Sequence, residues 1–474
     1  MKLAFSFPLV TLTACGYSSP FAVCQCSMHD KYGLLSTPIS SVLCRMTIPV
    51  MFGMIAILMF NLVNTFFVSL LGTHALAAIS FTFPVTFTIN CVTMGIGVGL
   101  STRIGHLIGQ GNAHSAARLA THGLLLSITT IVIIALLGRL SIDPLFLALG
   151  ADHTLLPLIH QYMDIWYLII PLLVIPMTSS SIVRATGNTK TPAKMMMFSA
   201  LLNSVLDPLF IFGCAPIPAF GIQGAALASA ISWLCVCIGF TRLLIRSKLL
   251  SIPQLSLLLS DWSTILKLGT PAALSNAMVP ITSAIFMRLL STHGTTAVAA
   301  FGAAQRIESI LMIVLMSLTS ALSPFMAQNF GAQKPQRSFT SLFVSMRFAL
   351  LFQSAIFIAM VPLSVPLSAL FSQEPTVRSL LWHYLLIVPI SYGFQGMVMM
   401  LIAGLNALQK PLYAFLWSSL RLFILTLPLA WLGSQYYGAE GLFAGIALGN
   451  VLAGMLSYFF ALRLRKTLGK PVRL

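Results

Sequence analysis

The chain has 474 residues, of which 58% are hydrophobic and 7% are charged, and its formal net charge is +17. A soluble globular domain usually carries about 25% charged residues, so this composition excludes an ordinary soluble protein, whose solvated surface needs more charges. The positive charge alone would suit a nucleic-acid-binding protein, but the positions of the basic residues favour a membrane protein without a nucleic-acid partner.

Apolar runs that are long enough to cross a bilayer, such as residues 123–138 with their flanks, recur along the whole chain. Only helices and closed barrels satisfy every backbone group inside a membrane, and the strict alternation of a barrel strand is absent. We therefore predict an all-α polytopic membrane protein with about twelve transmembrane helices. In chain order they lie near residues 46–70, 76–107, 116–141, 155–182, 192–213, 223–245, 264–290, 297–328, 339–365, 379–405, 411–433 and 440–463.

Basic residues fall into every second gap between these predicted spans, and the alternate gaps hold few. Lysine and arginine are enriched in the cytoplasmic loops of membrane proteins, so this pattern predicts that both termini are cytoplasmic. The residues that carry the pattern are Arg118, Lys190, Lys194, Arg246, Lys248, Lys334, Arg337, Lys410, Arg465, Lys466, Lys470 and Arg473.

An internal repeat divides the chain in two. The sequence GTHALAA at 72–78 is nearly repeated as GTTAVAA at 294–300, 222 positions later, and Pro49 and Pro271 have the same separation. We predict two homologous bundles of six helices, related by a pseudo-two-fold axis along the membrane normal because each unit has an even number of spans. Two such bundles can enclose a cleft and rock against each other, which is the construction of an alternating-access transporter.

The predicted parts are an N-terminal segment at 1–43, an N-terminal lobe at 44–246, a cytoplasmic linker at 247–263, a C-terminal lobe at 264–465 and a basic cytoplasmic tail at 466–474. Two interpretations stay open for residues 1–27. Leu12–Cys15 resembles a lipoprotein cleavage site, but cleavage there would contradict the topology that the charges predict. Alternatively, Met28 is the working start, so that residues 1–27 are not part of the working protein.

Asp207 lies deep in a predicted span, within LLNSVLDPLFIFG at 201–213. A charge at the centre of a transmembrane helix costs about 2.5–3.5 kcal/mol, so this side chain should face the bundle interior or a cavity. Burial disfavours the charged form, and a buried carboxylate can therefore take up and release a proton near neutral pH. Asn203 lies one turn earlier on the same face, and Pro208 frees the backbone carbonyl of Ser204. We predict an ion-coupling site here; structural hydrogen bonding is the alternative.

Two further acids lie inside predicted spans. Glu308 is two residues from Arg306, which is on another face of the helix, and closer in angle to Gln305. It is predicted either to contribute to ion coupling or to pair with another helix. Asp164 lies about two turns inside its span and can reach the headgroup region.

The sequence contains no phosphate-binding loop of the GxxxxGK[ST] type and no soluble domain to hold one. Transport driven by ATP is therefore not expected from this chain alone. We predict a secondary transporter, not an enzyme, without a cofactor and driven by a gradient of H⁺ or Na⁺.

Six stretches resemble motifs of the multidrug and toxic compound extrusion (MATE) family, and the resemblance covers nearly all of residues 31–465. It implies two six-helix lobes, a cleft that opens outward, and export of amphipathic organic cations, including drugs, in exchange for H⁺ or Na⁺. We expect a monomer in a bacterial cytoplasmic (inner) membrane. The six stretches are residues 64–80, 184–192, 202–213, 221–229, 300–310 and 327–333.

The resemblance also implies functional residues in the N-terminal lobe. Asp207 and Asn203 match an aspartate and an asparagine of the family's ion site, and Ser229 takes the place of a threonine there. Tyr162 matches a tyrosine of the same network. Pro49 matches the proline at which the first span is proposed to bend, and is predicted to be a hinge.

One position departs from the family. The motif that usually reads Val-Asp-Thr is VNT at 63–65, so Asn64 replaces an aspartate. An amide carries no proton or charge, but its oxygen can coordinate Na⁺. Three alternatives follow: one proton cycles on Asp207, Na⁺ binds at Asp207, Asn203 and Asn64, or Glu308 in the other lobe contributes.

Two other functions stay open. A lipid-linked saccharide flippase of similar architecture would need many cations to hold a pyrophosphate, and only Arg306 and Arg421 are candidates. A non-transporting membrane scaffold is suggested only by the missing aspartate.

Overall fold

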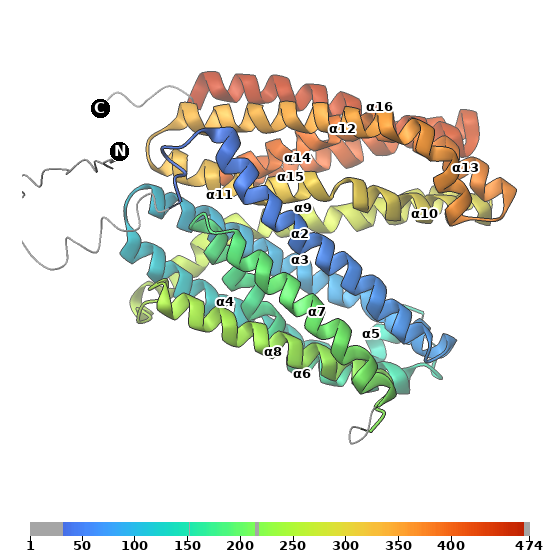
Figure 1. Cartoon of the computed structure of the whole chain (residues 1–474), viewed down its shortest axis with the longest axis horizontal. Coiled ribbons are helices and arrows are strands. Elements are labelled where there is room, and N and C mark those ends of the chain that lie inside the picture. The colour runs from blue at the N-terminus through green and yellow to red at the C-terminus, as the bar shows by residue number, and fades with distance from the viewer. Residues whose placement is uncertain (1–31, 151, 214–217, 469–474) are drawn as a thin grey trace, which may run out of the picture.

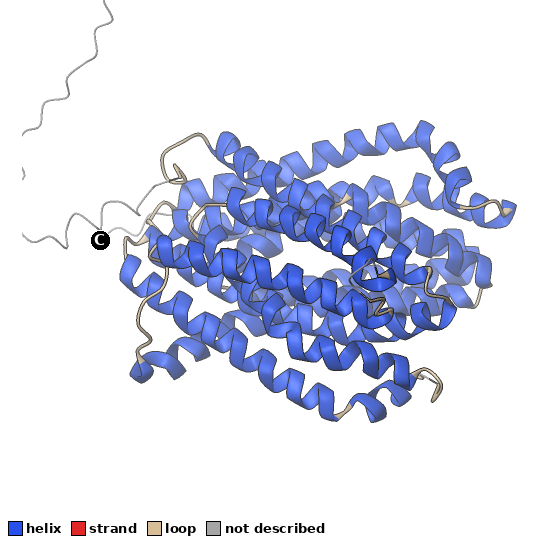
Figure 2. Cartoon of the chain, turned by 60° about the horizontal axis from the view of Figure 1, so that its bottom comes forward, coloured by secondary structure: helices blue, strands red, loops and turns tan. Residues whose placement is uncertain are grey.

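The computed structural model describes residues 32–150, 152–213 and 218–468, and these residues form helices and connecting loops without a β-strand (Figure 2). The prediction of an all-helical membrane protein is confirmed. The open questions about residues 1–27 and Met28 lie outside the described residues, as does the end of the predicted tail at 469–474.

Six long helices form the N-terminal lobe, and a short helix, α5, connects the third and fourth of them (Figure 1). Each long helix contains one of the predicted spans, apart from a few terminal residues. The helices are α2 (Ile39–Ser69), α3 (Thr73–Gly109), α4 (Ala113–Leu140), α5 (Ile142–Ala148), α6 (Leu156–Ala185), α7 (Lys190–Phe212) and α8 (Ile222–Arg246).

The C-terminal lobe repeats this order with more interruptions. Helix α9 already begins at Leu255, within the predicted linker, and later helices are divided by a break, a 3₁₀ turn and a π-helix. The elements are α9 (Leu255–Ser291), α10 (Thr295–Leu311), α11 (Ile313–Gly331), α12 (Pro335–Phe371), α13 (Pro375–Ile387), a 3₁₀ turn (Pro389–Ser391), α14 (Tyr392–Ala407), α15 (Pro411–Ser419), a π-helix (Leu420–Thr426) and α16 (Leu427–Leu468).

By length and composition, the described residues contain 10 helices that can cross a membrane, or 11 when the bent pair α10 and α11 counts as one span. The longest, Pro411–Leu468, has 58 residues. A straight helix of that length would measure about 87 Å, far more than a bilayer. Its backbone leaves the helical conformation at Tyr437 and Gly438, so we count it as two spans, which gives the twelve predicted.

The π-helix accommodates one extra residue in the second copy of the repeat. Pro192 and Pro411 stand 219 positions apart, whereas Pro208 and Pro428 stand 220 apart. The additional residue therefore lies between Pro411 and Pro428, where the π-helix occurs. A π-helix is a common means of absorbing a single residue within an α-helix, and such segments are frequent at functional sites.

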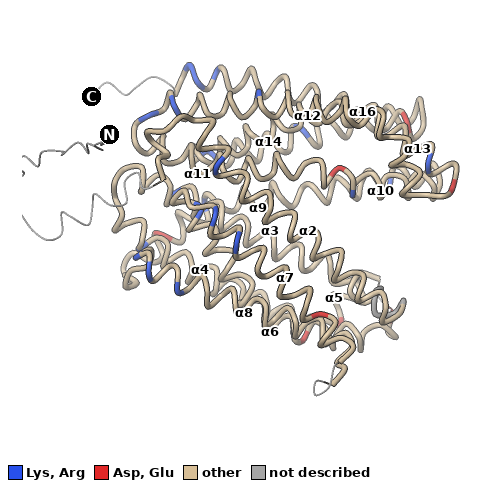
Figure 3. Tube along the Cα trace, viewed as in Figure 1, with Lys and Arg blue, Asp and Glu red and all other residues tan. Residues whose placement is uncertain are grey.

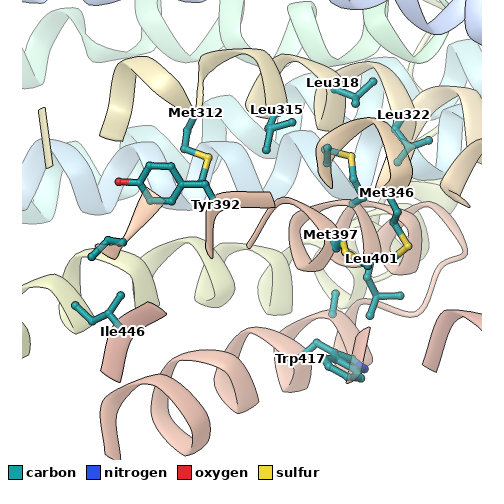
Figure 4. Packing of buried hydrophobic residues seen from close by; sticks show 14 of the residues in the cluster. Met312, Leu315, Leu318, Leu322, Met346, Tyr392, Met397, Leu401, Trp417 and Ile446 are labelled. Atoms are coloured by element: carbon teal, nitrogen blue, oxygen red, sulfur yellow. The ribbon is translucent and has the colours of Figure 1, made fainter. Parts of the chain in front are cut away.

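Methionine, leucine and aromatic side chains fill the core of the C-terminal lobe. Figure 4 shows Met312, Leu315 and Tyr392 packed together, with Met346 and Leu401 further along the same cluster. All five side chains are buried. The core of this lobe is therefore apolar from the break at Met312 onward along α11.

Lysine and arginine gather at the end of the molecule where α2 begins and α16 ends, and only a few lie elsewhere (Figure 3). The positive-inside rule predicts that this end faces the cytoplasm, and we call it the cytoplasmic end. The two lobes also approach most closely here. A Cβ atom added to Gly109 of α3 would lie 2.2 Å from the backbone oxygen of Gln328 in α11, and one added to Gly331 would lie 2.4 Å from that of His106. Only glycine permits this close approach of α3 and α11.

Candidate functional site

Asp207 lies on α7 inside the N-terminal lobe, and its side chain is fully buried, with 0% of its surface exposed. Helix α7 continues through Pro208, which follows it. The ion pairs formed among the described residues all involve other acids, so no lysine, arginine or histidine neutralises this carboxylate. A buried carboxylate without a counter-ion is suited to take up a cation or a proton.

Hydrogen bonds connect Asp207 to polar side chains of three helices, directly or through Asn203. The amide nitrogen of Asn64, on α2, donates to Oδ2 of Asp207 at 3.0 Å. In the amide orientation that satisfies both neighbours, Asn203 donates to Oδ1 and Oδ2 at 2.8 and 3.2 Å. Its amide oxygen then accepts from the hydroxyl of Ser229, on α8, at 3.2 Å. The network ties α2, α7 and α8 to a single carboxylate.

This arrangement offers neutral donors to a charged acceptor, which stabilises the ionised carboxylate. A sodium ion would require Asn64 and Asn203 to turn their amide oxygens toward it, because Na⁺ binds oxygen and not N–H groups. A proton would need no such turn. Among the described residues, no group of three or more His, Cys, Asp and Glu side chains forms a metal site.

Two other predicted residues lie nearby. Tyr162 on α6 is close enough to Asp207 for an electrostatic interaction, but no hydrogen bond joins the two within the described part of the chain. Pro49 lies inside α2, which runs unbroken from Ile39 to Ser69. The hinge at Pro49 stays a prediction.

Glu308 lies in the other lobe, on α10, and forms a separate polar cluster. Its Oε2 accepts from the hydroxyl of Tyr384 at 3.0 Å, and its Oε1 accepts from Nε2 of Gln395 at 3.3 Å. Gln305, which the helical angle placed near Glu308, instead donates to Ser283. The two clusters belong to different lobes, so no shared two-carboxylate site forms.

Asp164 is more exposed and is already paired. Arg139 donates to its Oδ1 at 3.1 Å, and His160 lies between it and Asp143. The carboxylate side chain is 38% exposed. An exposed ion pair of this kind contributes about 0–1 kcal/mol and leaves the acid without an evident transport role.

The structure adds a pair of interlobe hydrogen bonds that the sequence analysis missed. Nε2 of His106, on α3, bonds the backbone oxygen of Ala407 at 2.8 Å, and Nε2 of Gln328, on α11, donates to that of Ala185 at 2.6 Å. His106 and Gln328 are 222 positions apart, and so are Ala185 and Ala407. The two hydrogen bonds are therefore equivalent under the internal repeat. The constant offset of 222 residues was the sequence signal from which this pair could have been predicted.

The inter-lobe linker is also fixed at the cytoplasmic end. Asp261 accepts from Arg118 at 3.1 Å and bonds Nδ1 of His122 at 2.7 Å. The backbone N–H of Gln254 donates to Nε2 of the same histidine at 3.1 Å. Nε2 must be unprotonated to accept this bond, so Nδ1 carries the proton and donates to Asp261.

Comparison with known proteins agrees with this architecture. The family model MatE matches residues 49–209 and 271–432, once in each lobe. The chain is 43% identical, over 92% of its length and 97% of the relative's, to a protein of Shewanella oneidensis named FAD transporter. It is 25% identical to a probable multidrug resistance protein of Bacillus subtilis, YoeA, over 82% of this chain and 86% of that one.

Among solved structures, the Vibrio cholerae MATE transporter VcmN in its bent form superposes with a TM-score of 0.87 at 32% identity. The match covers 91% of this chain and 98% of VcmN. Together with the repeated family match, this shows that the chain is a multi-pass membrane protein that belongs to the MATE family of transporters.

Proposed function

We propose that this chain exports a flavin dinucleotide such as FAD by alternating access, driven by the uptake of H⁺ or Na⁺ at Asp207. The 43% identity to a FAD transporter, along nearly the whole length of both proteins, is the observation that carries the proposal. The substrate would then be an amphipathic anion, which differs from the organic cations that the MATE resemblance alone suggested.

A cavity at the seam between the lobes supports an aromatic substrate. It has a volume of about 620 Å³ and lies between α3, α4 and α9. Its walls include Phe83 and Phe87, and Thr88, Thr130 and Thr270 supply hydroxyl groups. Pockets for small molecules commonly measure about 300–1,000 Å³ and combine apolar walls with a few polar groups. The ring systems of a flavin dinucleotide suit such a lining.

The polar network around Asp207 supports the coupling step. The carboxylate is buried and lacks a protein counter-ion, and it joins α2, α7 and α8. Binding a cation would alter the bonds from Asn64 and Asn203, and so change how α2 packs on α7. We propose that this change is transmitted to the lobe interface. The clustering of lysine and arginine at one end of the molecule (Figure 3) supports cytoplasmic termini, and we propose the bacterial cytoplasmic membrane as the location.

Export of organic cations is the second candidate, and the relatives named for multidrug resistance and export favour it. YoeA is one of them, at 25% identity, and the multidrug export protein MepA of Staphylococcus aureus is another, at 26% over 65% of this chain. The flippase and the scaffold are less well supported, because neither corresponds to any of these relatives.

Proteoliposomes containing the purified chain separate the two candidates. Under an imposed ion gradient, FAD should accumulate and an organic cation such as ethidium should not. Ethidium transport without FAD transport would replace the proposed function with the second candidate. Movement of neither compound would contradict both.

A further inference from the structure

The C-terminal lobe contains a polar cluster at membrane depth that the proposed coupling at Asp207 does not use. We call Glu308, Tyr384, Gln395, Arg421 and Asn450 the C-lobe polar cluster. Tyr384 and Gln395 donate to Glu308, and Asn450 donates to the amide oxygen of Gln395 at 3.4 Å. Four side chains, from α13, α14, α16 and the π-helix, thus gather around the one carboxylate of α10.

The backbone is irregular next to each of three members. Glu308 is four residues before the 46° bend between α10 and α11 at Met312. Gln395 follows the 3₁₀ turn Pro389–Ser391, and Arg421 lies in the π-helix. Irregular backbone at membrane depth is tolerated where it is buried in protein or lines a cavity that water can reach. Because three such irregularities occur beside one polar cluster, they favour a binding site over a packing defect.

Arg421 is the unusual member, because its guanidinium makes no hydrogen bond and no ion pair within 4.0 Å to any described residue. Its position, ten residues after the start of α15, corresponds to about 15 Å of helix and hence to the middle of the bilayer. Glu308 interacts with it electrostatically from beyond ion-pair distance, and the side chain is only partly buried. Five N–H donors remain for a ligand.

Glu308 and Arg421 together match the chemistry of a nucleotide. A guanidinium binds phosphate oxygens through two parallel N–H bonds, which is why arginine is favoured for phosphate recognition. Each oxygen of Glu308 accepts one bond from the protein and keeps a lone pair for a hydroxyl donor. Ribose or ribityl hydroxyls and a neighbouring diphosphate present those two groups side by side.

We propose that the C-lobe polar cluster is the subsite for the diphosphate of a dinucleotide, with Arg421 binding the phosphate oxygens and Glu308 accepting from a hydroxyl group. This inference rests on the proposed export of a flavin dinucleotide and names the residues that recognise its charged part. Glu308 then serves substrate recognition, while cation coupling stays in the N-terminal lobe.

The test compares the binding of FAD to the purified full chain with that of riboflavin, which has the flavin ring and ribityl chain of FAD but lacks its diphosphate and adenosine. Arg421→Gln should weaken FAD binding about 10- to 100-fold, the range expected for losing charge-assisted hydrogen bonds. Riboflavin binding should change less than about twofold, because the lost group does not touch it. ADP should compete with FAD on the wild-type chain and lose this ability on the variant.

Arg306→Gln is the matched control, since it removes the same group from an exposed position on α10. It should leave FAD binding unchanged. Arg421→Lys keeps the charge and is the second variant if Arg421→Gln does not fold; it should bind FAD with intermediate affinity.

The outcomes separate this inference from the proposed function. A wild-type chain that does not bind FAD overturns both. If the wild-type chain binds FAD, two results would overturn the subsite alone. In the first, Arg421→Gln binds FAD as tightly as the wild type does. In the second, its affinity for riboflavin falls to the same extent as its affinity for FAD.

Discussion

The two lobes carry their buried carboxylates on different kinds of backbone. In the N-terminal lobe, Asp207, Asn64 and Ser229 lie on α7, α2 and α8, each of which is a continuous helix. In the C-terminal lobe, Glu308 and Arg421 lie beside a bend and within a π-helix. Continuous helices hold a compact network that can respond as a unit to one small ion. Interrupted helices expose backbone and side-chain groups over a wider area, which suits a larger ligand.

The positions that match across the repeat sharpen this contrast. Met312, at the bend, corresponds to Asn90, where α3 continues and the amide bonds the backbone oxygen of Thr86 at 2.9 Å. Asp207 corresponds to Leu427, which also precedes a proline. At the cytoplasmic end, however, the two copies still make the same contacts. Duplication has therefore preserved the surfaces on which the lobes meet, while the interiors have diverged.

The largest effect is expected from removing the charge in the N-terminal lobe. Asp207→Asn keeps the size and most hydrogen bonds but removes the negative charge and the group that takes up a proton, so FAD export should fall by at least about 100-fold while membrane insertion is retained. The export rate is measured as the amount of FAD that cells expressing the protein release into the medium. Asp164→Asn is the control and should export normally, because its exposed pair with Arg139 contributes little.

A single deletion makes the C-terminal lobe more like the N-terminal one. Removing Phe423 takes away the extra residue and should convert the π-helix into regular α-helix, which rotates Arg421 by about 100° relative to the residues after it. FAD binding should fall about tenfold or more, while the protein remains folded and monodisperse on gel filtration. Unchanged FAD binding by a folded deletion variant would mean that the π-helix has no part in recognition.

The close approach of the lobes at the cytoplasmic end depends on the glycine contact between α3 and α11. In Gly331→Leu, the added Cβ would lie 2.4 Å from the backbone oxygen of His106, so the lobes must separate. Transport should slow about tenfold, since the cytoplasmic end could no longer close fully. Spin-label distances across the lobes should increase at this end. Gly302→Ala, on α10, has no neighbour within 4 Å of the new atom and should behave like wild type.

The smallest effect concerns the paired hydrogen bonds at the same end. His106→Gln should be tolerated, because glutamine makes the equivalent bond at Gln328. His106→Ala should lose one bond, worth about 0.5–1.5 kcal/mol, and so open the cytoplasmic end about two- to tenfold more often. Cysteine cross-linking across the end measures this population. Equal behaviour of the two variants would show that the bond does not hold the lobes together.

The sequence was sufficient for the spans and for the pair of Asn203 and Asp207, because both depend on short spacings. Hydrophobic length located the spans, and the separation of Asn203 and Asp207 by one turn put them on the same face. Asn64 bonds Asp207 from 143 positions away. The sequence showed Asn64 as a polar residue inside a predicted span, but only the family resemblance connected it with Asp207.

The second cluster could not be assembled in this way. Tyr384 and Gln395 are 76 and 87 positions from Glu308, and the direction of that carboxylate depends on a bend whose angle no local pattern encodes. The sequence marked Glu308 as an acid inside a predicted span, and it named Arg421 only as one of two candidate cations for a flippase cleft. Only the packing of α10 against the interrupted helices brings them together.

Uptake of FAD into inside-out membrane vesicles, with a pH gradient and a Na⁺ gradient imposed separately, tests the central proposal most directly. We expect one of the two gradients to drive FAD accumulation by the wild-type chain, and neither to drive it in Asp207→Asn. Equal accumulation by the wild type and the variant would contradict the assignment of Asp207 as the group that couples cation flow to transport.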